Sequence, residues 1–156
     1  MSAASISGTT RTSHRAHCKD LEMKKILPSA PIRIARPSGD LGAIERFWTR
    51  GVGMEVLWRT EGDAEGGHRL AMVGIPGAPW HLELVDDPAA AAESSPGPED
   101  LLVIYLGEPA DQVLLDRIAD AGGRRVAARN PYWDRWGVTI ADPDGYLLVL
   151  SERTWD

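Results

Sequence analysis

The same order of structural elements occurs twice between residue 31 and the C-terminus, and this internal repeat is the strongest constraint on the fold. Pro31–Pro37 alternates isoleucine with arginine, as a short strand does, and Asp40 is placed to cap a helix over Leu41–Arg50 that Gly51 ends. Glycine-rich turns separate three further extended segments, Gly53–Arg59, His68–Ile75 and Pro79–Val85. The first half is therefore predicted to be βαβββ.

The second half has the same predicted order. Leu101–Leu106 is a nearly continuous apolar run that suits a buried strand, and a helix follows, with Pro109 in its first turn and Gly122-Gly123 at its end. Three more extended segments come next: Arg124–Arg129, Trp136–Ala141 and Tyr146–Ser151. A repeat of this kind predicts an α+β fold in which each half packs its sheet on its own helix around a shared concavity.

The repeat has a defined register. Gly51–Val56 aligns with Ala121–Val126, and His81–Val85 aligns with Leu147–Ser151, so Glu83 and Val149 are equivalent positions. We expect a module over residues 31–86, a second over residues 100–153, and between them a linker rich in Pro, Ala and Ser over residues 87–99.

Residues 1–30 are predicted to be a flexible tail. Its His14, His17 and Cys18 lack the fourth ligand and the rigid frame of a metal site.

Composition and charge exclude several classes of protein. Hydrophobic residues make up 43% of the 156 residues and charged residues 26%, which is ordinary for a globular domain. No apolar run approaches the roughly 18 residues that span a bilayer. The net charge is -6, and residues 1–30 carry five basic and two acidic side chains, so the rest of the chain is an acidic body that disfavours nucleic-acid binding. The single cysteine excludes an internal disulfide and suits a reducing cytoplasm.

The chain resembles the vicinal oxygen chelate superfamily, which includes glyoxalase I, bleomycin-resistance proteins and extradiol dioxygenases. The resemblance covers residues 31–153. The segments that carry it are Ile32–Ile34 before Asp40-Leu41, Phe47-Trp48 before Gly51–Gly53, His81–Leu84, and Val138–Tyr146 with its Asp-Pro-Asp-Gly turn. It implies two βαβββ modules whose eight strands curl around a cup, usually in a homodimer.

The resemblance also implies four strand positions that hold a metal in the enzymes of the superfamily. Here they fall on Arg33, Glu83, Leu101 and Val149, and only Glu83 is a competent ligand, because a guanidinium repels a divalent ion. We therefore expect no metal and no other cofactor. An Arg33–Glu83 ion pair is predicted at the former metal position, with His81 extending it from the same strand face. The pair is either a structural buried pair or a grip on an anionic or polar ligand group.

Aromatic residues suggest a second part of the binding surface. The chain has six tryptophans and one phenylalanine, and Asn130–Trp136 places Tyr132, Trp133 and Trp136 in a predicted loop. These side chains either stack on a planar ligand or pack at a dimer interface. Trp58 and Trp80 lie on strands and could face either side.

The leading hypothesis is a metal-free protein that binds a small organic ligand in an aromatic-lined cup. The predicted ligand-binding residues are Arg33, His81, Glu83, Tyr132, Trp133 and Trp136. The alternative is a lyase, isomerase or dioxygenase-like enzyme of the superfamily that uses His81 or Glu83 as an acid or base. A third possibility is an interaction module whose cup is filled by its own side chains.

Overall fold

The computed structural model describes residues 25–63 and 67–155, so most of the predicted tail, with His14, His17 and Cys18, lies outside the described residues. The first module contains β1 (Ile32–Ser38), α1 (Leu41–Arg46), the π-helix η1 (Phe47–Val52), β2 (Glu55–Thr60), β3 (Leu70–Gly74) and β4 (Trp80–Asp86). After α2 (Pro88–Glu93), the second contains β5 (Leu101–Tyr105), α3 (Gln112–Asp120), β6 (Arg124–Val126), α4 (Pro131–Arg135), β7 (Gly137–Ala141) and β8 (Leu147–Ser151).

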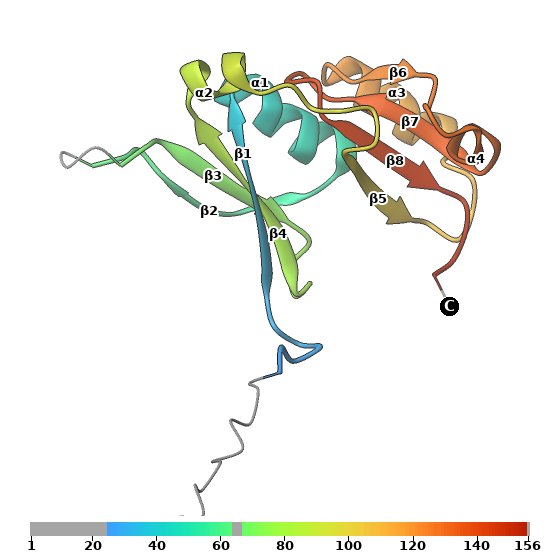
Figure 1. Ribbon diagram of the computed structural model, residues 1–156, viewed down its shortest axis with the longest axis horizontal. Coiled ribbons are helices and arrows are strands. Elements are labelled where there is room, and N and C mark those ends of the chain that lie inside the picture. Colours follow the sequence, from blue (N-terminus) through green and yellow to red (C-terminus); the bar gives the residue numbers. More distant parts are fainter. Residues whose placement is uncertain (1–24, 64–66, 156) are drawn as a thin grey trace, which may run out of the picture.

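The two sheets confirm the predicted repeat (Figure 1). The first has the strand order β1-β4-β3-β2 and the second β5-β8-β7-β6. In both, the first and last strands of the module pair in parallel, and the remaining pairs are antiparallel. The eight strands form two separate four-stranded sheets and no closed barrel among the described residues.

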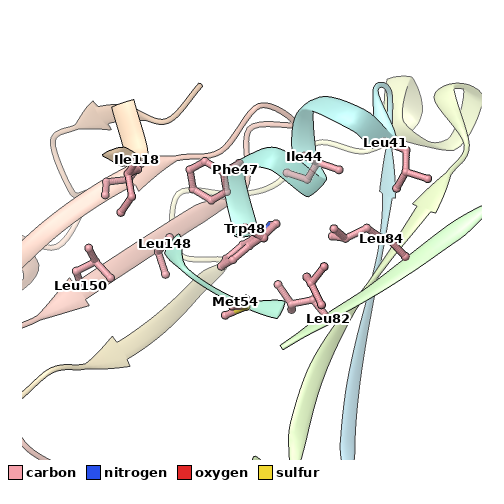
Figure 2. Close-up of a cluster of buried hydrophobic side chains, with 13 residues drawn as sticks. Leu41, Ile44, Phe47, Trp48, Met54, Leu82, Leu84, Ile118, Leu148 and Leu150 are labelled. Carbon is pink, nitrogen blue, oxygen red and sulfur yellow. The ribbon is translucent and has the colours of Figure 1, made fainter. Parts of the chain in front are cut away.

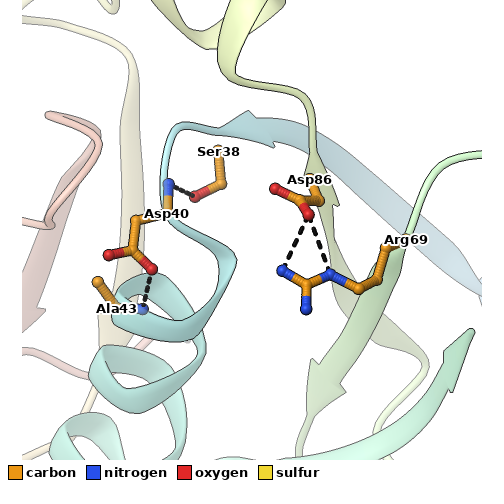
Figure 3. Close-up of polar contacts among 5 residues, drawn as sticks. All are labelled: Ser38, Asp40, Ala43, Arg69 and Asp86. Carbon is orange, nitrogen blue, oxygen red and sulfur yellow. Dashed lines mark hydrogen bonds and ion pairs between the residues drawn. The ribbon is translucent and has the colours of Figure 1, made fainter. Parts of the chain in front are cut away.

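The first helix begins where the sequence predicts and then changes its winding. Asp40 Oδ1 accepts a hydrogen bond from the backbone N–H of Ala43 at 2.9 Å (Figure 3), which satisfies a free donor of the first turn. The predicted α-helix to Arg50 is α-helical only to Arg46, and a π-helical turn continues to Val52. Gly53 ends it with a left-handed φ of 95°. The π-turn coincides with two adjacent buried aromatic residues, Phe47 and Trp48.

Two short helices lie where no helix was predicted. The predicted linker contains α2, capped by Asp87, and the predicted aromatic loop contains α4, capped by Asn130. In each, a proline follows the cap, and its fixed φ and missing N–H suit the first helical position. The start of α3 was also wrongly predicted: Asp111 caps it, so Pro109 precedes the helix.

One hydrophobic core spans both modules (Figure 2). Phe47 and Trp48 contact each other edge to face, with ring centroids 5.1 Å apart. Both are fully buried among residues of the first sheet, the second sheet and α3, namely Leu82, Leu84, Leu148, Leu150 and Ile118. Helix α3 packs closely on η1, and Arg117 Nε donates to the carbonyl of Gly51 at 2.9 Å. The modules therefore share the packing that stabilises them.

Candidate functional site

Three polar side chains meet on the first sheet, on the face opposite the core. The parallel register sets Arg33 of β1 beside His81 of β4, and Glu83 follows on the same face two residues later. Arg33 Nη1 donates to Glu83 Oε2 at 2.9 Å, and Arg33 Nε donates to His81 Nε2 at 3.2 Å. The predicted ion pair and its extension by His81 are both present.

This ion pair is open to solvent on one side. The side chain of Arg33 is 52% exposed and that of Glu83 is 15% exposed, so the pair is only partly buried. A fully buried structural pair would present no polar atoms to a ligand. Here the guanidinium group keeps free N–H donors at the surface, because only two of its five N–H groups serve the two protein contacts.

The pair forms one wall of an open hollow of about 550 Å³. Apolar side chains complete the lining: Trp58, Leu70 and Met72. Trp58 is 52% exposed, and it lies opposite Met72 across the β2–β3 pairing. A register shift between Val56 and Trp58 decides which face the indole occupies, and the alternation of residue types did not reveal it. Trp80 instead packs against the core.

The residues of the hollow do not fit the metal that the superfamily implies. Of the four equivalent positions, Glu83 alone offers an anionic oxygen, and a guanidinium is already bonded to it. Leu101 and Val149 carry no donor atoms. In the described part of the chain, no three His, Cys, Asp or Glu side chains gather into a group that could hold a metal ion.

The hydrogen bonds also show which acceptor atoms of the two possible acid–base groups are already engaged. His81 accepts at Nε2 from Arg33 Nε, so this nitrogen is already engaged. Glu83 has one carboxylate oxygen engaged by the same guanidinium. Arg33 therefore engages an acceptor atom of each group, and Glu83 keeps its second carboxylate oxygen.

The corresponding face of the second sheet is closed. Val149, which is equivalent to Glu83, is 0% exposed, and neighbouring Thr139 on β7 is 1% exposed. Leu101, equivalent to Arg33, is half-buried opposite Leu147. The duplicated units thus differ: the first sheet presents charged atoms to solvent, and the second buries an apolar surface.

The predicted aromatic residues lie on the second module. Tyr132 and Trp133 of α4 contact each other at 5.0 Å between centroids, and Trp136 follows the helix with the guanidinium groups of Arg135 and Arg153 4.9 and 5.0 Å from its ring. Because α4 packs on β7, this cluster is far from β1 and β4 (Figure 1). Within one chain, the structure does not bring the aromatic cluster to Arg33, His81 and Glu83.

A second polar cluster lies at the junction of the modules. The Arg36 guanidinium stacks over the Tyr146 ring at 4.4 Å, and Asp144 Oδ1 accepts from the N–H of Gly39 at 2.9 Å. Asp142 Oδ1 accepts two backbone N–H groups, whereas its Oδ2 is buried with no partner among the described residues. Burial raises the pKa of Asp142 to about 6 and lowers that of Arg36. Apart from the turn itself, no pattern in the sequence predicted this cluster.

The paired modules and the four-stranded sheets define a protein of the vicinal oxygen chelate superfamily. Residues 32–85 match the YycE-like N-terminal domain and residues 99–152 the YycE-like C-terminal domain. YycE of Bacillus subtilis (strain 168) is 35% identical over 123 residues, which are 78% of this chain and 87% of that protein. The chain therefore belongs to the YycE-like family.

Solved structures agree with this assignment. A crystal structure of YycE from Bacillus subtilis, a protein of unknown function, has a TM-score of 0.67 and 32% identity over 82% of this chain and 93% of that one. The trypanothione-dependent glyoxalase I of Leishmania major has a TM-score of 0.60 with 18% identity, covering 78% and 84%. TnmS3, an antibiotic binding protein from Streptomyces sp. CB03234, has a TM-score of 0.55 with 23% identity, covering 83% and 100%. At such identities the last two show the fold alone.

Proposed function

We propose that this chain is a metal-free binding protein of the glyoxalase/bleomycin-resistance type that holds a small organic ligand in the hollow of the first sheet. One observation carries the proposal: the Arg33–Glu83 pair, which His81 extends, borders a largely apolar hollow that contains Trp58. A ligand would stack on the indole and bond to the free donors of Arg33. The superfamily fold also serves TnmS3, an antibiotic binding protein, so it is compatible with sequestration.

The alternative of a lyase, isomerase or dioxygenase-like enzyme has less support. Acid–base catalysis needs a base with a free lone pair within reach of the substrate. His81 Nε2 already accepts from Arg33, and Glu83, although it keeps one oxygen, is held in an ion pair with the same guanidinium. The contacts of these groups therefore favour binding over catalysis.

The proposal is tested by a screen of small organic compounds, antibiotics included, that follows intrinsic tryptophan fluorescence and thermal stabilisation. For a compound that binds, we expect Trp58→Ala and Arg33→Met each to weaken affinity at least about tenfold, because they remove the stacking surface and the donor group. Trp155→Ala is the matched control, because Trp155 is 83% exposed and lies outside the hollow.

Two results would contradict the proposal. The first is affinity that depends on Trp133 and is unchanged by Trp58→Ala, which would move the ligand to the aromatic cluster of the second module. The second is tight divalent metal binding in calorimetry that Glu83→Ala abolishes, which would restore a metal site.

We also propose a cytoplasmic homodimer. Several apolar side chains near the edges of the first sheet are exposed, namely Ile32, Leu57 and Ile75, and burial in an interface would remove them from water. Light scattering coupled to gel filtration should give twice the mass of one chain, and a monomer at micromolar concentration would contradict the dimer.

The proposed cytoplasmic location is tested by the compartment in which a fluorescent fusion of the chain is found. No helix in the described residues is long and apolar enough to cross a membrane.

A further inference from the structure

We infer that the hollow of the first sheet selects uncharged ligands that carry a hydrogen-bond donor and an acceptor side by side, as a primary amide or a lactam does, on a planar body. This inference rests on the proposed function, because it names the class of ligand for the same hollow. Its basis is the balance of charge and of free hydrogen-bonding atoms around Arg33.

The polar group of the hollow carries no net charge. Among the described residues that line it, Arg33 and Glu83 are the charged ones, and their side chains are in contact at 2.9 Å. His81 is not among the lining residues, and its Nε2 accepts the Arg33 Nε–H. A ligand carboxylate that approaches Arg33 therefore also approaches the carboxylate of Glu83, and a ligand cation that approaches Glu83 also approaches the guanidinium. A charged ligand group of either sign is therefore attracted by one member of the ion pair and repelled by the other.

The same contact leaves free donors next to a free acceptor. Arg33 has five N–H groups and uses its Nε–H and one N–H of Nη1, so three have no partner among the described residues. Glu83 uses Oε2 and keeps the lone pairs of its second oxygen. An amide edge offers a carbonyl to the first set and an N–H to the second. This pairing satisfies both partners without placing a further charge in the hollow.

The remaining lining suits a planar apolar body. Trp58 is half exposed, and Met72 lies directly opposite it on β3. An indole face and a thioether both make favourable contacts with aromatic rings. The hollow therefore combines one flat apolar wall with one neutral polar edge, which matches an aromatic or heteroaromatic amide.

Three probes of nearly the same shape test the inference: benzamide, benzoate and benzamidinium. Each is titrated at pH 7 against the isotope-labelled full chain, following the NMR signals of the Trp58 indole N–H and the Met72 methyl group. We expect benzamide to bind at least about fivefold more tightly than either charged probe. Trp155→Ala is the control, and it should leave the order of the three affinities unchanged.

Variants that unbalance the charge should reverse the preference. Glu83→Gln leaves the guanidinium uncompensated, so benzoate should gain about tenfold and bind most tightly. Arg33→Gln leaves the carboxylate uncompensated, so benzamidinium should gain similarly. Circular dichroism checks that each variant folds. If a variant does not fold, the ranking of the three probe affinities in the parent protein tests the inference alone.

The outcomes separate the two proposals. If benzoate or benzamidinium binds most tightly to the parent protein at Trp58 and Met72, the inferred selectivity is wrong and the binding function stands. If none of the three shifts these signals, the amide class is wrong. The proposed function itself fails if the compound screen also finds nothing that depends on Trp58, or if a divalent metal binds tightly at Glu83.

Discussion

At the scale of single residues, Asp142 is the group through which pH acts on the fold. Its pKa in the folded protein is about 6, raised from 3.8 mainly by burial. The folded protein therefore binds this proton more readily than the unfolded chain does. The stability that this group contributes is full below about pH 4 and is lost as the pH rises through about 6.

We expect Asp142→Asn to raise the free energy of unfolding at pH 7 by about 1 to 3 kcal/mol. The amide keeps an oxygen for the backbone N–H groups of Asp144 and Tyr146, and it removes the cost of a buried charge with an unpartnered oxygen. Urea unfolding between pH 4 and 7 should show a flatter dependence in this variant. Asp116→Asn, on an exposed helix face, is the control and should keep the parent's slope. A variant less stable than the parent at pH 7 would show that the charge is needed.

At the scale of elements, the contact between α3 and η1 depends on a glycine after α3. A Cβ on Gly123 would lie 2.6 Å from Ile118 Cγ2, 2.9 Å from the Ile118 carbonyl oxygen and 2.9 Å from Phe47. Because the neighbours include backbone and two buried side chains, they cannot move without cost. We expect Gly123→Ala to lower the free energy of unfolding by about 1 to 3 kcal/mol in chemical denaturation.

Gly39→Ala is the matched control for that prediction, because the nearest atom to a Cβ there is 3.8 Å away. It keeps the N–H that bonds to Asp144. An equal loss of stability in both variants would show that backbone freedom, rather than the close contact, is responsible.

Strands and helices with a clear periodic pattern of apolar residues could be predicted from the sequence. The two short capped helices were not predicted. Alternation and glycine turns identified the strands of both modules to within a few residues, except β6, which ends at Val126. The helices α2 and α4 have sequence signals, Asp87-Pro88 and Asn130-Pro131, in which a capping residue precedes a proline. The first segment was interpreted as a linker because it is rich in proline, and the second was interpreted as a loop because it is rich in aromatic residues. For the site, Arg33 and Glu83 followed from the resemblance to the superfamily's metal positions, and His81 followed from strand alternation. The side on which Trp58 lies depends on a register shift between β2 and β3 that the residue types do not indicate.

At the scale of the whole molecule, the shared core predicts that the two modules unfold together. Trp48 is buried between the sheets, so Trp48→Ala should cost about 3 to 5 kcal/mol. Hydrogen exchange should then show equal loss of protection in β4 and β8. Trp155→Ala, at an exposed residue, should change neither. Loss of protection in one sheet alone would mean that each module has an independent core.

The unequal faces of the two sheets imply that substitutions in the two copies of the duplicated unit affect different properties of the protein. On the second sheet, Val149 and Thr139 are enclosed by their own chain, so volume decides which residues are tolerated there. On the first, Arg33 and Glu83 border the hollow, so replacing them tests the proposed binding more than the packing. In saturation mutagenesis, substitutions on the second face should therefore mainly reduce folding. Substitutions on the first face should mainly reduce ligand binding. Duplication would then have separated the maintenance of the fold from its use.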